Sequence, residues 1–416
     1  MLQTKKADFK QIGARFRIDP VTARIIRNRG IEGEAAIDRY LNGTLDDLYD
    51  PMLLKDMERA VSILCEAVDT GKKIRIVGDY DIDGVCSTYI LLQAFERLGS
   101  DVDFEIPDRI KDGYGINESI IEQAHADGVE VILTCDNGIS AFHQVELAKK
   151  YGMTVVITDH HEVPLDGEKE KIPPADAVID PKQADCPYPF PEICGAVVAY
   201  KLVQVLYARR GVPQMEWLDL LEFAAIATVG DVMKLQDENR ILVKYGLKKM
   251  AQTKNLGLRR LAEKNNLDLG AITAYHIGFV IGPCLNAGGR LKTAKEALAL
   301  LRAQSEEEAE RLAEELKELN DTRKDMTEQG TEAAKLQVES WYQKDKVLVV
   351  FLPECHESLA GIIAGRLREY YQKPAIVLTR GEEAVKGSGR SIDEYHMFKK
   401  LTEVSDLLLK FGGHPL

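Results

Sequence analysis

The stretch MTVVITDHHEV, residues 153 to 163, places an apolar run directly before an aspartate and two adjacent histidines. The run from Met153 to Ile157 has the length and composition of a buried β-strand. At its end, Asp159, His160 and His161 bring one carboxylate and two imidazoles to a place that a ligand can reach. Because imidazole and carboxylate together suit manganese, zinc or iron, the stretch predicts a strand that leads into a metal site.

Other apolar runs surround this stretch and alternate with helical patterns. The candidate strands are Ile74–Val77, Val102–Ile106, Val129–Thr134, Thr154–Thr158 and Ala175–Ile179. Helical patterns between them include Ser87–Leu98, Glu118–Ala126 and Ser140–Tyr151. Strand and helix alternating at this spacing predict a parallel sheet with helices on its faces. The expected fold class is therefore α/β.

The rest of the chain divides into regions of different character. Residues 1–70 are polar and helical in pattern, and precede an α/β domain predicted at residues 71–300. Residues 301–343 are rich in charge and in helix-favouring residues, which predicts one long linker helix with a possible interruption near Gly330. Further strand and helix patterns in residues 344–416 predict a smaller α/β accessory domain.

Composition limits the class of protein. Of the 416 residues, 45% are hydrophobic and 29% are charged, which is typical of a globular protein with several domains. No apolar run is long enough to span a membrane, so no membrane partner is expected. Seven scattered cysteines and an N-terminus unlike a signal peptide predict reduced thiols and a cytoplasmic location. The net charge of −13 argues against coating nucleic acid by bulk charge, but not against a nucleic-acid enzyme with a local groove.

A second cluster, GDYDIDG at residues 78–84, follows the first candidate strand and holds three alternating carboxylates. Such carboxylates repel one another, and a bound cation offsets that repulsion. The spacing opens like a calcium-binding EF-hand loop, but Ile90 occupies the twelfth position, where that loop has Glu. The cluster also resembles the aspartyl-phosphate motif of haloacid dehalogenases, which requires a later lysine and an acidic pair. The third interpretation is a transition-metal cluster shared with the other strand ends.

Two further aspartates favour the third interpretation. Asp136, in TCDNG, ends the strand before the DHH stretch, and Asp231, in ATVGD, follows an apolar helix. Ligands bind beyond the carboxyl ends of the strands in an open parallel sheet, so three successive acidic strand ends should converge there. A lone aspartate such as Asp231 is more often a helix cap or a surface charge. Adjacent histidines are also often ordinary exposed residues at a helix start, but the neighbouring acidic strand ends argue for a shared metal site.

Four motifs, GDYDIDG, CDNGIS, TDHHE and ATVGDVMKL, resemble those of the DHH phosphoesterase superfamily, and within it the RecJ single-stranded-DNA-specific 5′→3′ exonucleases. The stretch GPCLNAGGR, residues 282–290, is similar to an Asn-Ala-x-Gly-Arg motif of RecJ proteins. The stretch YDPMLLKDMERAV, residues 49–61, resembles their lead-in to the catalytic domain. CHESLAGIIAGRL, VKGSGRSI and FGGHP resemble the DHH-associated accessory domain. The resemblance implies a DHH catalytic domain joined by a long helix to that accessory domain.

The resemblance also implies two divalent cations, with Mn²⁺ as the first choice and Mg²⁺ as the second. Asp136 would bridge the two ions. One ion would have the further ligands Asp83, His160 and Asp231. The other would be held by Asp79 and Asp81, with Asp79 in place of a histidine that several relatives have at the position of Val77.

Other residues are expected to act on the substrate. His161 would contact the scissile phosphate or the attacking water, and Asp159 would orient a neighbouring imidazole. Arg290, on a loop whose glycines allow close approach, is the first candidate for a cation that stabilises the developing charge. The full set expected to bind phosphates or bases is Asn286, Arg290, Ser388, Arg390 and His414.

The implied function is metal-dependent 5′→3′ hydrolysis of single-stranded DNA to 5′-mononucleotides, in DNA repair and recombination. A helicase and a single-strand-binding protein are candidate partners. Three alternatives stay open: a DHH phosphodiesterase acting on short RNA or cyclic dinucleotides, a DHH pyrophosphatase, and an inactive scaffold. Because RecJ proteins continue beyond the final FGGHPL, we expect an incomplete accessory domain, with reduced stability and processivity.

Overall fold

The structure, a computed structural model, describes residues 6–381 and 384–409. Its centre is a parallel sheet with the strand order β2-β1-β3-β4-β7. The strands are β1 (Ile74–Val77), β2 (Val102–Glu105), β3 (Val131–Cys135), β4 (Thr154–Thr158) and β7 (Ala177–Ile179). The predicted α/β class is confirmed. Every residue of β1 and β3 is buried, which explains why these strands read as unbroken apolar runs.

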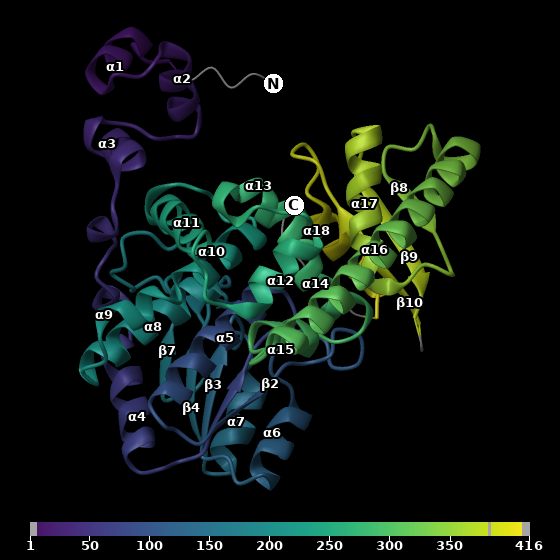
Figure 1. The fold of residues 1–416 in the computed structure, drawn as a ribbon. Coiled ribbons are helices and arrows are strands. Elements are labelled where there is room, and N and C mark those ends of the chain that lie inside the picture. Colours follow the sequence, from purple (N-terminus) through teal and green to yellow (C-terminus); the bar gives the residue numbers. More distant parts are fainter. Residues whose placement is uncertain (1–5, 382–383, 410–416) are drawn as a thin grey trace.

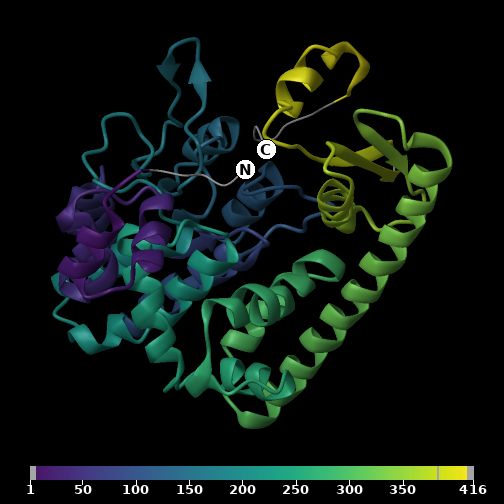
Figure 2. The same ribbon diagram turned by 90° about the horizontal axis from the view of Figure 1, so that it is seen from above.

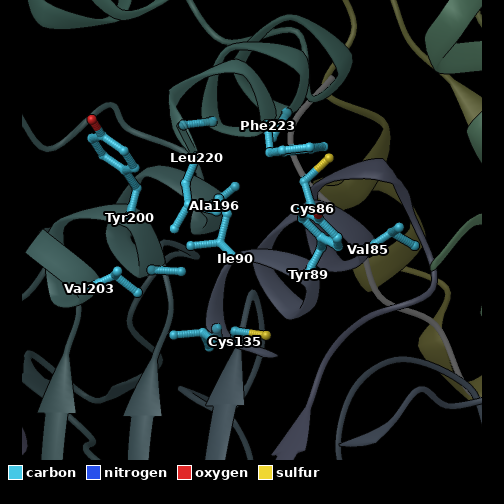
Figure 3. Close-up of a cluster of buried hydrophobic side chains, with 14 of the residues drawn as sticks. Val85, Cys86, Tyr89, Ile90, Cys135, Ala196, Tyr200, Val203, Leu220 and Phe223 are labelled. Atoms are coloured by element: carbon cyan, nitrogen blue, oxygen red, sulfur yellow. The ribbon is translucent and has the colours of Figure 1, made fainter. Parts of the chain in front are cut away.

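Helices cover both faces of this sheet (Figure 1). One face packs against α4 (Met57–Asp69), α5 (Ile82–Arg97), α8 (Gly195–Arg209) and α10 (Leu221–Gly230). The other packs against α6 (Glu118–Ala126) and α7 (Phe142–Lys150). Figure 3 shows side chains of α5, α8 and α10 meeting in the larger core, with Cys135 of β3 at its base. Helix α5 begins five residues before the predicted Ser87, because Asp81 caps its first turn.

The order of the strands reverses direction between β1 and β3, in the middle of the sheet. β2 lies on one side of β1 and β3 on the other, so the chain turns in opposite directions after these neighbouring strands. Ligands of open α/β sheets bind beyond the carboxyl ends of the strands at such a reversal. The residues that follow β1 and β3 therefore occupy the expected binding position.

The N-terminal region forms three short helices with a core of their own. They are α1 (Phe9–Phe16), α2 (Pro20–Asn28) and α3 (Glu34–Asn42), and they stand at the periphery in Figure 1. Ile26, Ile31, Ile37 and Tyr40 make up their small core. The unit contacts the larger α/β part through α11 (Asp237–Met250), where Arg39 forms an ion pair with Asp237 at 3.0 Å.

One long helix, α16 (Glu306–Gln337), connects the two α/β parts, as Figure 2 shows from above. It continues through Gly330, so the predicted interruption there is wrong. A Cβ at Gly330 would lie 2.6 Å from Cδ1 of Ile363, and the glycine thus permits close packing of α16 on α17 (Glu357–Tyr371). No described helix has both the length and the apolar character needed to cross a membrane.

The accessory part is a three-stranded sheet with the order β10-β9-β8. Strand β8 (Leu348–Phe351) runs parallel to β9 (Ala375–Arg380), and β10 (Val385–Arg390) is antiparallel to β9. Helix α17 lies between β8 and β9 in the chain and packs on the sheet with α16. This small α/β unit agrees with the predicted accessory fold.

Arg290 does not lie on a loop, as the sequence suggested, but in the last turn of α14 (Gly282–Leu291). The neighbouring glycines serve close packing of this helix. A Cβ at Gly289 would lie 2.3 Å from the carbonyl oxygen of Tyr80, and one at Gly288 would lie 2.7 Å from that of Thr293. Because only glycine fits there, α14 can lie against the segment that follows β1.

Candidate functional site

The segment after β1 is held rigidly by backbone hydrogen bonds. Asp81 caps α5, since its Oδ1 accepts from the amides of Asp83 at 2.9 Å and Gly84 at 3.1 Å. Asp83 is 1% exposed, and its carboxylate accepts from the amides of Gly195 and Ala196 at the start of α8. The positive N-terminal end of α8 therefore stabilises a buried negative charge.

Asp136 follows β3 in a left-handed backbone conformation, with φ of 61°. A Cβ at Gly195 would lie 2.7 Å from the Cβ of Asp136, so α8 can approach this aspartate only with glycine at its first position. Asp136 Oδ1 lies 3.0 Å from Nε2 of His160, which follows β4. The ends of adjacent strands thus bring these two side chains into contact.

The carboxylate of Asp159 forms hydrogen bonds to three residues of the protein. Its Oδ1 accepts from the amides of His160 at 2.7 Å and His161 at 3.2 Å, and lies 2.7 Å from Nδ1 of His161. Its Oδ2 accepts from the amide of Ile139 at 2.9 Å. Burial opposes its negative charge, but the His161 hydrogen bond and the two histidine charges outweigh it and hold the pKa of Asp159 below its usual range. Asp159 is thus placed to orient His161.

His161 is fixed from a second side by Tyr114, a residue that the sequence analysis did not identify. The Tyr114 hydroxyl donates to the carbonyl oxygen of Asp136 at 2.6 Å and lies 3.0 Å from Nδ1 of His161. Burial lowers the affinity of His161 for a proton, but the hydrogen bond and charge of Asp159 raise the pKa of His161 to about 9. Tyr114 stands between two glycines with positive φ, Gly113 and Gly115, and this GYG pattern was the available signal.

Asp231, the C-cap of α10, completes the cluster. A Cβ at Gly230 would lie 2.5 Å from Cγ2 of Ile82, so the end of α10 packs directly on the start of α5. Asp231 Oδ2 lies 3.9 Å from Nε2 of His160, and the same nitrogen lies 3.4 Å from Oδ2 of Asp83. His160 therefore stands among carboxylates from three different elements.

Three groups in this cluster have the geometry of metal ligands, with candidate ligand atoms all within 4.8 Å of one another in each group. The groups are Asp79–Asp81–Asp136, Asp83–His160–Asp231 and Asp136–His160–His161. All six residues predicted from the sequence as ligands therefore lie in one place, and Asp136 belongs to two of the groups. Asp159 belongs to none of them.

The charges of the cluster fit a cation. Burial and the charge of Asp81 raise the pKa of Asp79 well above its usual range, and burial with Asp83 does the same for Asp136. Burial, Asp83 and Asp81 raise the pKa of Asp231 to about 8. Among the described residues, the ion pairs of these carboxylates involve histidine and neither lysine nor arginine. Divalent cations would compensate this crowding, and oxygen and imidazole ligands suit manganese.

A cationic cavity lies beside the cluster, between α14 and the accessory sheet. Its volume is about 320 Å³. Lining residues with polar or charged side chains are Arg109, Arg290, Glu357, Ser358, Lys386, Ser388 and Arg390. The Cζ atom of Arg109, a residue not predicted from the sequence, lies 3.9 Å from the centroid of the Tyr80 ring. In the sequence, Tyr80 stands between the ligand candidates Asp79 and Asp81. A residue that lines the cavity thus contacts the segment that carries Asp79 and Asp81.

The arginines of the cavity crowd one another. Burial, with the neighbouring Arg109 and Arg323, lowers the pKa of Arg290 to about 10. Burial and Arg368 also lower the pKa of Arg390. A Cβ at Gly361 would lie 2.8 Å from Oγ of Ser388, so the glycine lets α17 approach β10. Crowded guanidinium groups beside a serine hydroxyl favour a bound anion, and phosphate matches their fork geometry.

Two predicted nucleic-acid contacts stand elsewhere. Asn286 Oδ1 accepts from the amide of Ile82 at 2.9 Å, which gives Asn286 a role in holding α14 against the start of α5. His414 lies outside the described residues. Arg290, Ser388 and Arg390 are the members of the predicted set that the cavity brings together.

Comparison with known proteins gives two family matches within the chain. The N-terminal domain of the DHH family matches residues 73–228, and the DHHA1 domain matches residues 344–416. Sequence similarity to single-stranded-DNA-specific exonucleases named RecJ extends over nearly the whole chain. The proteins from Bacillus subtilis and Haemophilus influenzae are 37% and 35% identical, over 98% and 97% of this chain. The chain spans about half, 51%, of the first relative's length and 72% of the second's.

Solved structures agree with these matches. A RecJ from Thermus thermophilus in complex with Mn²⁺ superimposes with a TM-score of 0.82 at 31% identity, covering 98% of this chain and 57% of that one. An exonuclease RecJ bound to manganese gives a TM-score of 0.75 at 33% identity, covering 87% of this chain and 89% of that one. Both relatives carry the same metal.

Proposed function

The chain belongs to the RecJ family of single-stranded-DNA-specific exonucleases, and on that premise we propose that it hydrolyses single-stranded DNA from the 5′ end with two bound divalent cations. The product is a 5′-mononucleotide, and the expected process is DNA repair and recombination. The observation that carries the proposal is the convergence of three candidate ligand groups, two of which contain Asp136, beside a cavity of crowded arginines.

The proposed ligand assignment uses two of the three groups. Asp79, Asp81 and Asp136 would hold one ion, and Asp83, His160 and Asp231 would hold the other. Asp136 would also serve the second ion, since its Oδ1 lies 3.0 Å from Nε2 of His160. Manganese is the first choice, with magnesium second. Two ions bound there would neutralise charge on the scissile phosphate and activate the attacking water.

The remaining residues bind and orient the strand. His161, held by Asp159 and Tyr114, presents an imidazole beside the ligand groups, where it stabilises charge that develops on the phosphate oxygens. Arg109, Arg290, Ser388 and Arg390 hold a phosphate of the strand in the cavity. Because these donors come from both α/β parts, the substrate lies between them.

We propose that the four regions predicted from the sequence have separate roles. Residues 71–300 form the catalytic domain, residues 344–416 supply the facing wall, and the linker helix within 301–343 sets the width between them. Residues 1–70 form the N-terminal extension. A width that admits one strand and excludes a duplex would explain specificity for single-stranded DNA.

The proposed setting is the cytoplasm, where the seven free cysteines would stay reduced. Since the substrate must be unpaired, a helicase that opens duplexes and a single-strand-binding protein are the proposed partners.

The proposal is tested by digesting a long single strand in the presence of Mn²⁺, with a label at either the 5′ or the 3′ end. Early release of labelled mononucleotide from the 5′ end by the wild-type chain, and not by Asp136→Ala, is the expected result. Early release from the 3′ end contradicts the polarity. Cleavage restricted to short RNA or cyclic dinucleotides would instead assign the chain to the other DHH phosphodiesterases.

A further inference from the structure

The first 30 residues differ in charge from the rest of the chain. They contain eight lysines and arginines but only two acidic residues, a net charge of +6. The other 386 residues contain 46 basic and 65 acidic residues, a net charge of −19. This segregation places a cationic unit on an otherwise acidic protein.

The two acidic residues of this segment do not neutralise it. Asp8 and Asp19 are the N-caps of α1 and α2, and their carboxylates accept from backbone amides. Two of the arginines are paired with α3 or the loop before it: Arg15 with Glu34 and Arg27 with Glu32. Those four side chains thus serve the folding of the unit.

Four other basic side chains of this segment are exposed, and they form no such ion pairs with the described residues of the unit. Lys6, Lys10 and Arg17 form no ion pair within residues 6–381 and 384–409. Arg24 lies over the ring of Phe9, 5.0 Å from its centroid, and also forms no ion pair in that part of the chain. We call these four the N-terminal basic surface. Exposed cations that form no ion pair with the described acidic residues are available to phosphates.

Apolar side chains flank one of these cations. Val21 and Ile25 are 67% and 50% exposed, and with Arg24 they lie on one side of α2, three and four residues apart. The small core of the unit uses Ile26 instead. Aliphatic side chains beside an arginine suit an unpaired strand, whose bases and sugars are open to contact, better than a stacked duplex.

The unit is attached close to the metal cluster. Gln236 Nε2 donates to the carbonyl oxygen of Arg29 at 2.6 Å, and Gln236 stands five residues after Asp231. Arg240 Nε, in α11, donates to the carbonyl oxygen of Tyr40 at 2.7 Å. The short segment between Asp231 and α11 therefore links the cationic unit to the rim of the catalytic crevice.

We propose that the N-terminal basic surface binds the sugar-phosphate backbone of the single strand downstream of the nucleotide being removed, an inference that rests on the proposed function. It would keep a long strand on the enzyme between cleavage steps. A strand too short to extend from the metal cluster to α1 and α2 would gain nothing from it.

The test measures binding of a labelled deoxythymidine strand to the full chain in EDTA, where no cleavage occurs. The variant Lys6→Gln/Lys10→Gln/Arg17→Gln removes three charges. We expect weaker binding of the long strand, and a slope of log affinity against log salt that is flatter by about 2, since each phosphate contact on a single strand contributes about 0.7. Affinity for a short strand should be unchanged.

A matched control removes the same number of charges elsewhere. Lys150, Lys344 and Lys346 are exposed and lie outside the ion pairs of the described residues, so Lys150→Gln/Lys344→Gln/Lys346→Gln gives the same net charge. The proposal is overturned if both variants change the slope equally, or if neither does. An equal loss on duplex DNA would overturn the assignment to single strands. An acidic peptide bound in place of DNA would also overturn it.

Two further measurements separate the causes of failure. Equal hydrogen-exchange protection of the backbone amides of α1 and α2 in variant and wild type excludes local unfolding of these helices, and Lys6→Arg/Lys10→Arg should retain the wild-type slope. Digestion with Mn²⁺ tests the proposed function independently. A wild-type chain that digests neither strand contradicts that function, whereas an unchanged slope in EDTA contradicts only the basic surface.

Discussion

The acidic cluster and the arginine cavity lie side by side, yet they are built in opposite ways. The cluster takes its side chains from the ends of β1, β3 and β4 and from α10, and backbone amides hold several of its carboxylates. The cavity takes its cations from the loop after β2, from α14 and from β10. The cluster thus depends on one sheet, while the cavity exists only when both α/β parts are in place.

Their electrostatics are also opposite. Burial and like charges raise the pKa values of Asp79 and Asp136, and lower the pKa of Arg290. Each site carries an excess of one charge that its own residues leave uncompensated. Metal ions satisfy the first and phosphate the second, so a metal-bound phosphodiester is the ligand that complements both.

The largest expected effect comes from the carboxylate shared by two ligand groups. Asp136→Asn keeps the shape but removes a charge, and we expect kcat on single-stranded DNA to fall by about a thousandfold or more, about 4 kcal/mol. Steady-state digestion with Mn²⁺ measures it, with Asp101→Asn on the exposed surface as the control. If Asp136→Asn kept wild-type kcat, the shared ligand would have to be another residue.

A buried carboxylate outside both sites sharpens the comparison. Glu222 is 3% exposed, and its Oε1 accepts from Thr253 Oγ1 at 2.7 Å. Burial raises its pKa to about 7, despite the nearby Lys249 and with a contribution from Asp219. Because the folded pKa exceeds the unfolded value, this group stabilises fully below about pH 4.5, and its contribution is lost as pH rises through 7.

The corresponding variant is Glu222→Gln, which keeps the acceptor for Thr253. At pH 8 it should increase the free energy of unfolding by about 3 kcal/mol, and at pH 4 it should change it little. Urea unfolding at both pH values measures this difference. Equal effects at the two pH values would contradict the raised pKa. They would show that Glu222 does not bind a proton between pH 8 and pH 4.

The next effect tests whether Asp159 acts through His161. Asp159→Asn leaves an amide beside Nδ1 of His161, and we expect kcat to fall by about 30-fold, about 2 kcal/mol, with KM nearly unchanged. The pH profile of kcat should also move, since the charge of Asp159 supports protonation of His161. A rise in KM with constant kcat would place Asp159 in substrate binding instead.

The smallest effect comes from the cavity, where several cations share the work. Arg390→Lys keeps the charge but loses the fork geometry, and we expect KM to rise about tenfold, about 1.4 kcal/mol, with little change in kcat. Arg380→Lys is the matched control, since Arg380 is exposed on the neighbouring strand. Equal KM values for both variants would show that the cavity does not hold the substrate phosphate.

Local patterns predicted the strands and the positions of the ligand candidates well, because buried parallel strands are apolar throughout and their carboxyl ends meet at one edge. They failed for α14, where glycines that looked like a loop serve close packing against Tyr80. They also missed Arg109 and Tyr114, whose partners Tyr80 and His161 are distant in the chain. The sequence around Arg109 and Tyr114 does not indicate which distant residue each of them contacts.

By itself, the sequence determined the α/β class and the identity of the acidic residues at the strand ends. These are properties of short segments, namely an apolar run, a terminal Asp or His, and a helix cap. Only the tertiary structure decided which side chains meet, such as Asp83 with the amides of α8, and Arg290 with Ser388 and Arg390 in one cavity. The reason is physical: close approach depends on glycines at Gly195, Gly289 and Gly361, and what each of them must make room for belongs to a distant part of the chain.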